Sequence, residues 1–167
     1  MSANTLNEKL QILVVDDEPE LGEALSGLFR GGGFAVKSAA SAEAALEIVR
    51  REHPPLIFCD IAMPGKSGLE FLGDLRRLGG LGAVVMLTAY SDHIKVVEAL
   101  RLGAVDYVTK PFDFRQLLAR TAVWLELGVR LASLSEGDCG VQDVKAKLRM
   151  IDLFRVKSDR MGNEDAS

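Results

Sequence analysis

Short apolar runs alternate with longer amphipathic stretches along the chain, and this alternation constrains the possible fold more than any other feature. The expected strands cover residues 11–15, 35–39, 56–59, 83–88 and 106–109. Three of these runs are apolar at every position or nearly so, which is typical of parallel strands covered on both faces. Because the runs are separated by helical patterns and short connections, we expect an α/β fold with one parallel sheet between two layers of helices.

The helical stretches carry recognisable start and stop signals. Pro19 stands near the start of the first stretch, and a run of glycines at 31–33 follows its end. Ser67 and Glu70 have the spacing of a capping box. Gly103 is a predicted C-terminal cap. The helices are expected to begin near Asp17, Ser41, Ser67, Asp92 and Asp113.

Composition excludes several classes of protein. The net charge of −4 gives no reason to expect a protein that coats nucleic acid. The two cysteines, Cys59 and Cys139, do not form a disulfide framework, which favours a reducing cytoplasm. The N-terminal residues lack the apolar segment of a signal peptide, and no apolar run approaches 18 residues. We therefore expect a cytoplasmic protein that is neither exported nor inserted into a membrane.

Polar side chains follow several of the predicted strands. Asp16 and Asp17 follow the first strand, Asp60 the third, Thr88 ends the fourth, and Lys110 follows the fifth. Each residue has an ordinary explanation by itself, such as a helix cap or a solvated loop cation. The carboxyl ends of parallel strands meet at one edge of a sheet, so these side chains are expected to converge there. Three neighbouring carboxylates repel one another unless a cation neutralises them.

The predicted cluster suits phosphoryl transfer. Mg²⁺ is bound in proteins by one or two carboxylates together with waters and substrate phosphate. An aspartate beside such an ion can act as a nucleophile toward phosphorus, and a lysine can neutralise phosphoryl charge from another side. The residues therefore indicate a site at which Asp60 accepts a phosphoryl group.

Four blocks of the sequence, "ILVVDDEP", "LIFCDIAMPGKSGLEFL", "VVMLTAY" and "GAVDYVTKPF", resemble the receiver domain of bacterial two-component response regulators. The resemblance covers about residues 10–125, with the blocks in the same order and spacing. It implies a doubly wound, flavodoxin-like sheet of five parallel strands in the order 2-1-3-4-5. It also implies that Asp60 is phosphorylated by a sensor histidine kinase or a histidine phosphotransfer protein.

The resemblance also assigns roles to individual residues. The Mg²⁺ ligands would be the carboxylates of Asp16, Asp17 and Asp60 and the backbone carbonyl of Ala62. Thr88 and Lys110 would contact the phosphoryl group, Tyr107 would be the switch aromatic, and the Lys110–Pro111 peptide bond would be cis.

Two other classes of protein fit the residues less well. A phosphatase of the haloacid-dehalogenase type would need a second aspartate at Ala62, so we do not expect an enzyme that turns over an external substrate. A flavodoxin-like cofactor binder would need a loop rich in hydroxyls and glycine after the first strand, where this chain has "DDEPE".

The fifth helix is expected to continue to about residue 134 and to carry two apolar faces. The face toward the sheet is predicted to contain Phe114, Leu117, Leu118, Thr121, Leu125 and Ala132. A second stripe is predicted to contain Trp124, Leu127, Leu131 and Leu134. A further amphipathic helix is expected within residues 135–160, near the C-terminus. Either this C-terminal helix covers the second stripe within one chain, or the stripe meets a second subunit or another protein. We favour the second interpretation, which includes a homodimer through the fifth and C-terminal helices.

We therefore divide the chain into a tail at 1–9, a receiver at 10–134, a linker and amphipathic helix at 135–160, and a disordered tail at 161–167. About 30 residues after the receiver cannot hold a helix-turn-helix domain, so no DNA-binding domain is expected. The output is expected to be a protein–protein contact, and the alternative is a phosphorelay intermediate or phosphate sink.

Overall fold

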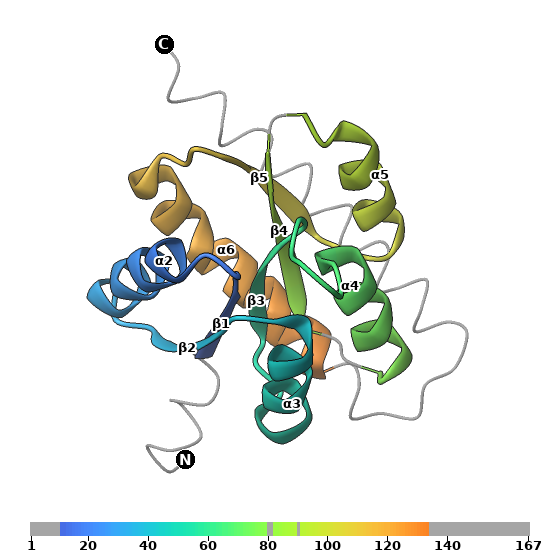
Figure 1. The fold of residues 1–167 in the computed structure, drawn as a ribbon. Helices are drawn as coiled ribbons and strands as arrows, with labels where there is room; N and C mark the ends of the chain where they lie inside the picture. The colour runs from blue at the N-terminus through green and yellow to red at the C-terminus, as the bar shows by residue number, and fades with distance from the viewer. Residues whose placement is uncertain (1–10, 80–81, 90, 134–167) are drawn as a thin grey trace.

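A computed structural model describes residues 11–79, 82–89 and 91–133. Its five strands form one parallel sheet in the order β2-β1-β3-β4-β5 (Figure 1). The strands are β1 (Gln11–Val15), β2 (Ala35–Ala39), β3 (Leu56–Asp60), β4 (Ala83–Ala89) and β5 (Asp106–Lys110). The predicted fold class and strand order are therefore confirmed, and the strand starts agree with those expected from the apolar runs.

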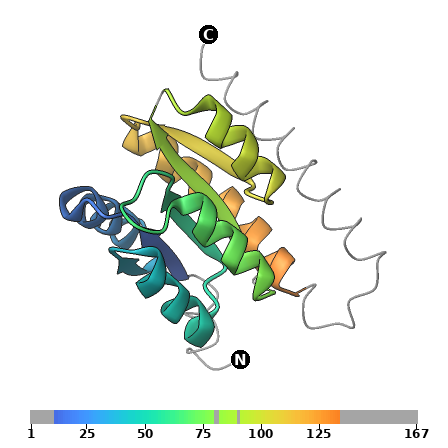
Figure 2. The same cartoon turned by 45° about the vertical axis from the view of Figure 1, so that its right-hand side comes forward.

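Helices cover both faces of the sheet. They are α2 (Pro19–Gly31), α3 (Ala42–Glu52), α4 (Gly68–Arg77), α5 (His93–Arg101) and α6 (Phe114–Ser133). Residues of α3, α4 and α5 pack into one apolar core, and residues of α2 and α6 pack into the other, on the opposite face of the sheet (Figures 1 and 2). Every residue of β3 is buried, as its continuous apolar run predicts.

Local capping follows the sequence signals in most of the helices. The Ser67 hydroxyl accepts a hydrogen bond from the Glu70 N–H, and the Glu70 carboxylate accepts one from the Ser67 N–H, so the capping box is confirmed. Ser41 caps α3 by accepting from the Ala44 N–H. Asp92 precedes α5 but makes no side-chain cap hydrogen bond.

Helix α6 differs from the prediction because residues of both predicted apolar stripes pack into the same core. Trp124 packs edge-on against Phe58 of β3, with ring centroids 5.6 Å apart. Leu127 and Leu131 belong to the same core as the sheet residues, whereas Phe114, predicted to face the sheet, is 45% exposed. The prediction that Trp124, Leu127 and Leu131 form a separate outer face is therefore wrong.

The close approach of α6 to the sheet explains this difference. A Cβ atom at Gly128 would lie 1.8 Å from the carbonyl oxygen of Pro55, so only glycine permits this contact. The helix therefore turns the face that contains Trp124 and Gly128 toward the sheet. These contacts remove the reason for assigning Trp124, Leu127 and Leu131 to a dimer interface. Leu134 and the predicted linker, C-terminal helix and tail lie outside the described residues, as do residues 1–9.

No helix within the described ranges combines the length and the apolar composition that crossing a bilayer requires.

Candidate functional site

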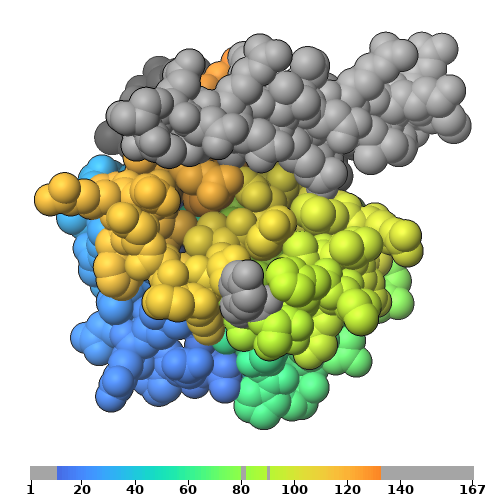
Figure 3. All heavy atoms as spheres, turned by 90° about the horizontal axis from the view of Figure 1, so that it is seen from above, coloured from blue at the N-terminus to red at the C-terminus, as the bar shows by residue number. Residues whose placement is uncertain are grey.

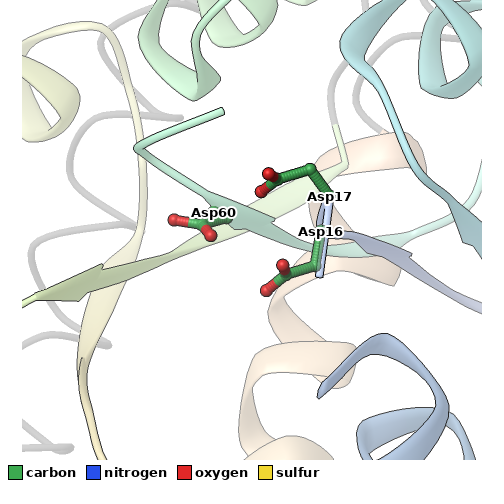
Figure 4. Close-up of side chains that lie close together, drawn as sticks. All are labelled: Asp16, Asp17 and Asp60. Atoms are coloured by element: carbon green, nitrogen blue, oxygen red, sulfur yellow. The ribbon is translucent and has the colours of Figure 1, made fainter. Parts of the chain in front are cut away.

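The three aspartates predicted to converge do so at the carboxyl edge of the sheet. Asp16 and Asp17 follow β1, and Asp60 is the last residue of the neighbouring strand β3. One carboxylate oxygen from each residue lies within 4.8 Å of the others (Figure 4). Asp16 and Asp60 are both 4% exposed, so this is a largely buried group of acids.

Backbone hydrogen bonds orient two of these carboxylates. Asp16 Oδ1 accepts from the Glu18 N–H at 2.9 Å, and Asp60 Oδ1 accepts from the Ala62 N–H at 3.0 Å. In each carboxylate one oxygen is held by the loop after its strand, and the other oxygen contacts Lys110. The predicted role of the Ala62 carbonyl as a metal ligand stays a prediction.

Lys110, the last residue of β5, reaches across the edge of the sheet to these acids. Its Nζ lies 2.8 Å from Asp60 Oδ2, 3.3 Å from Asp16 Oδ2 and 3.8 Å from Glu18 Oε1. Burial by itself would lower the pKa of Lys110, but the hydrogen bond to Asp60 and the charges of Asp60 and Asp16 outweigh burial and raise it. The ammonium is therefore the cation that neutralises the acids in this arrangement.

The surroundings of Asp16 disfavour the ionised form of its carboxyl. Burial raises the pKa of its carboxyl, and the charge of Asp60 adds to this effect. The Glu18 N–H and Lys110 counter only part of the increase. A further cation beside Asp16, Asp17 and Asp60 would stabilise the ionised acids, and carboxylate oxygens are the ligands that hard divalent ions prefer. The residues present therefore fit a Mg²⁺ site.

Thr88 and Tyr107 lie on the two strands beyond β3. Thr88 is 2% exposed and stands one position after Leu87, the residue paired with Asp60. Its hydroxyl donates to the Ala89 carbonyl oxygen at 3.0 Å. Tyr107 is 42% exposed, so its ring lies at the surface. The Lys110–Pro111 peptide bond is cis, as the resemblance implied.

Gly68 is a residue of this site that the sequence reasoning did not single out. Its N–H donates to the Ile61 carbonyl at 2.9 Å, and an added Cβ would lie 2.1 Å from the Asp60 carbonyl oxygen. The start of α4 therefore packs directly against the backbone of Asp60. The available signal was a glycine at the first helical position after a capping serine, but sequence alone does not show what lies beside it.

Residues 12–122 match the response regulator receiver domain, which is well over half of the chain. The chain belongs to this family. Solved receivers share its fold. A CheY-like receiver protein from Methanospirillum hungatei superposes with a TM-score of 0.68 at 28% identity, covering 72% of this chain and 96% of that one. The receiver domain of NtrX from Brucella abortus superposes with a TM-score of 0.66 at 32% identity, covering 69% and 98%.

The receiver is also similar in sequence to curated regulators. It is 43% identical over 110 residues to the DNA-binding response regulator MtrA of Mycolicibacterium smegmatis, covering 66% of this chain and 48% of MtrA. It is 40% identical over 113 residues to the transcriptional regulatory protein ZraR of Escherichia coli, covering 68% of this chain and 26% of ZraR. The chain thus spans about half the length of one of these relatives and about a quarter of the other.

These relatives correct one prediction. The protein was expected to have no DNA-binding domain, but relatives such as MtrA are DNA-binding response regulators. That prediction is wrong, because it rested on the length of the chain, and the chain matches only part of each relative.

Proposed function

We propose that this receiver is switched by Mg²⁺-dependent transfer of a phosphoryl group from a histidine kinase onto Asp60. The observation that carries the proposal is the group formed by Asp16, Asp17 and Asp60, in which one carboxylate oxygen of each lies within 4.8 Å of the others. The Lys110 ammonium donates a hydrogen bond to Asp60 in the same group. Phosphoryl transfer requires a positioned nucleophile, oxygen ligands for a divalent ion and a cation that neutralises charge on the phosphoryl oxygens.

In this proposal Asp16, Asp17 and Asp60 hold the metal ion. When bound, Mg²⁺ neutralises charge on the phosphoryl oxygens. A carboxylate oxygen of Asp60 attacks the phosphorus of a phosphohistidine. The P–N bond breaks, and the imidazole nitrogen leaves with its electron pair. The product is an acyl phosphate on Asp60.

Lys110 and Thr88 would then change partners. Lys110 now donates to Asp60 Oδ2, and a phosphoryl oxygen on that residue would take over the ammonium. The Thr88 hydroxyl now donates to Ala89, and turning toward the phosphoryl group would exchange one acceptor for a charged one. Tyr107, now at the surface, would turn inward as Thr88 moves. Its exposed ring and the present partner of Thr88 support our reading of this structure as the unphosphorylated state.

The output proposed for this switch is a change in an interaction surface. The similarity to MtrA and ZraR, named as DNA-binding and transcriptional regulators, supports regulation of transcription as the process that the receiver controls.

The first test replaces the phospho-acceptor. The wild type, incubated with acetyl phosphate and Mg²⁺, should gain the mass of one phosphoryl group in intact mass spectra, and Asp60→Asn should not. Asp74→Asn is a matched change on α4, at a residue that pairs with Lys66 and Arg77 and not with Asp16, Asp17 or Asp60, and it should label as the wild type does. Chelating Mg²⁺ should abolish labelling of the wild type. Undiminished labelling of Asp60→Asn would refute the assignment.

A further inference from the structure

A fourth acid, Glu18, lies beside Lys110 on the outer side of the site. Its Oε1 is 3.8 Å from Lys110 Nζ. Glu18 stands at the N-cap position of α2, yet its side chain makes no cap hydrogen bond with that helix. Its backbone is tied to the site, because the Glu18 N–H donates to Asp16 Oδ1. Helix capping therefore does not explain why this carboxylate lies beside Lys110.

The three acids around the Lys110 ammonium differ in their exposure to water. Asp60 and Asp16, the two nearer acids, have side chains that are 6% and 0% exposed, whereas the Glu18 side chain is 66% exposed. Helix α2 (blue) and the segment from β5 into α6 (yellow to orange) adjoin on the face shown in Figure 3. The ammonium thus lies between two buried acids and one acid that is open to solvent.

Lys110 and a divalent ion compete for the same carboxylates. Asp16 and Asp60 each have one oxygen held by a backbone N–H, and the other oxygen contacts Lys110. A metal ion bound by these two acids repels an ammonium that lies 2.8 Å from Asp60 Oδ2, so the ammonium has to withdraw. The Lys110 side chain is only 22% exposed, and a partly buried charge is costly to leave without a partner.

We propose that Glu18 is the acceptor that takes over the Lys110 ammonium when Asp16, Asp17 and Asp60 hold the metal ion. The inference rests on the proposed function, which assigns the ion to these acids. The ammonium is already within ion-pair distance of Glu18, so a small outward movement converts this contact into a hydrogen bond. Glu18 is thereby a positioning residue, which keeps the charge of Lys110 close to Asp60, where a phosphoryl group would need it.

Titration calorimetry with Mg²⁺, in the absence of any phosphodonor, tests this role in a double-mutant cycle on the full chain. Glu18→Gln should weaken the binding of Mg²⁺ about fivefold, because the displaced ammonium loses its acceptor. In the Lys110→Gln background the same change should weaken binding by less than about twofold, since no ammonium has to move and water screens the direct attraction between the exposed Glu18 and the ion. An equal factor in the two backgrounds, or no effect in either, would overturn the proposal.

Glu23 provides a matched control on the same helix. Glu23→Gln removes the same charge from an exposed position beyond the first turn of α2. It should leave the affinity for Mg²⁺ within about 1.5-fold of the wild type, because solvent and salt screen a more distant surface charge. A fivefold loss in Glu23→Gln as well would overturn the specific role of Glu18, since any negative charge on α2 would then suffice.

The same titrations separate this inference from the proposed function. If the wild type binds Mg²⁺ and the effects of Glu18→Gln and Lys110→Gln are additive, the metal site stands and the role of Glu18 is wrong. If the wild type does not bind Mg²⁺, the Mg²⁺ dependence in the proposed function fails, together with the inference that rests on it.

Discussion

At the scale of single residues, the geometry of Asp60 depends on a neighbour that has no side chain. Gly68 begins α4 directly against the Asp60 carbonyl, where an added Cβ would lie at 2.1 Å. The end of β3 at Asp60 is therefore positioned by backbone contact with Gly68 as well as by the hydrogen bond from the Ala62 N–H.

Gly68→Ala should destabilise the fold by about 2 kcal/mol, because the new methyl group forces α4 away from the end of β3. It should also slow labelling by acetyl phosphate. Urea unfolding and the rate of mass gain measure the two effects. Gly73→Ala is the control on the same helix, where only the end of Arg77 lies within 4 Å, and it should be neutral or stabilising by up to about 1 kcal/mol. A Gly68→Ala variant as stable as the wild type would contradict the packing described.

Lys110 provides a second prediction at this scale. Its ammonium neutralises Asp60 and Asp16 in the structure, so it competes with any added cation for these acids. Lys110→Gln should bind Mg²⁺ about tenfold more tightly, because the acids keep their mutual repulsion without a resident cation. Phosphorylation of the variant should nevertheless be slower. Titration calorimetry with Mg²⁺ measures the affinity, and a weaker or equal affinity would argue against this electrostatic account.

At the scale of the elements, α4 and α5 differ in how they begin. Ser67 and Glu70 satisfy the backbone at the start of α4 reciprocally, whereas Asp92 leaves α5 without a side-chain cap. The start of α4 is therefore capped by side chains beside the end of β3, whereas the start of α5 relies on the backbone hydrogen bond from the Asp92 N–H to the Ala89 carbonyl.

Ser67→Ala should lower the free energy of unfolding by about 1 kcal/mol, because the Glu70 N–H loses its acceptor. Ser67→Asp should retain most of the stability, since aspartate caps a helix about as well as serine. Thermal unfolding followed by circular dichroism measures both variants. Equal losses in the two would show that the side chain at this position acts through something other than the cap.

At the scale of the whole molecule, one polar network joins the edge strand β5 to the core that the sheet forms with α2 and α6. Asp106 pairs with Arg120 and accepts a hydrogen bond from Trp124 Nε1 at 3.1 Å, while the Arg120 guanidinium lies 4.6 Å from the centroid of the Trp124 ring. Trp124 also contacts Phe58, two residues before Asp60. The network links β5 through α6 to the strand that carries the candidate phospho-acceptor.

Trp124→Phe should cost about 2 kcal/mol, because it keeps a ring against Phe58 but removes the donor to Asp106 and weakens the contact with Arg120. In a double-mutant cycle with Asp106→Asn, the two changes should be coupled by about 1 kcal/mol. Urea unfolding gives both values. It is followed by circular dichroism because Trp124 is the single tryptophan of the chain, and its replacement removes the fluorescence signal. Strictly additive losses would exclude a direct energetic link between the two residues.

The strands, the helices and the charged residues that follow the strands could all be predicted from the sequence. Apolar runs, a capping serine and glycine stops are local signals, and the edge rule for parallel sheets then places Asp16, Asp17, Asp60 and Lys110 together.

Two features could not be predicted from the sequence: the face of α6 that packs on the sheet, and the close contacts between backbones far apart in the chain. The contacts of Gly128 with Pro55, Gly68 with Asp60 and Arg76 with Gly103 join segments that are separated along the chain. Helical periodicity shows that a face is apolar, but the side that a helix buries depends on where two backbones can approach each other, and that distance is set only when the whole chain has packed.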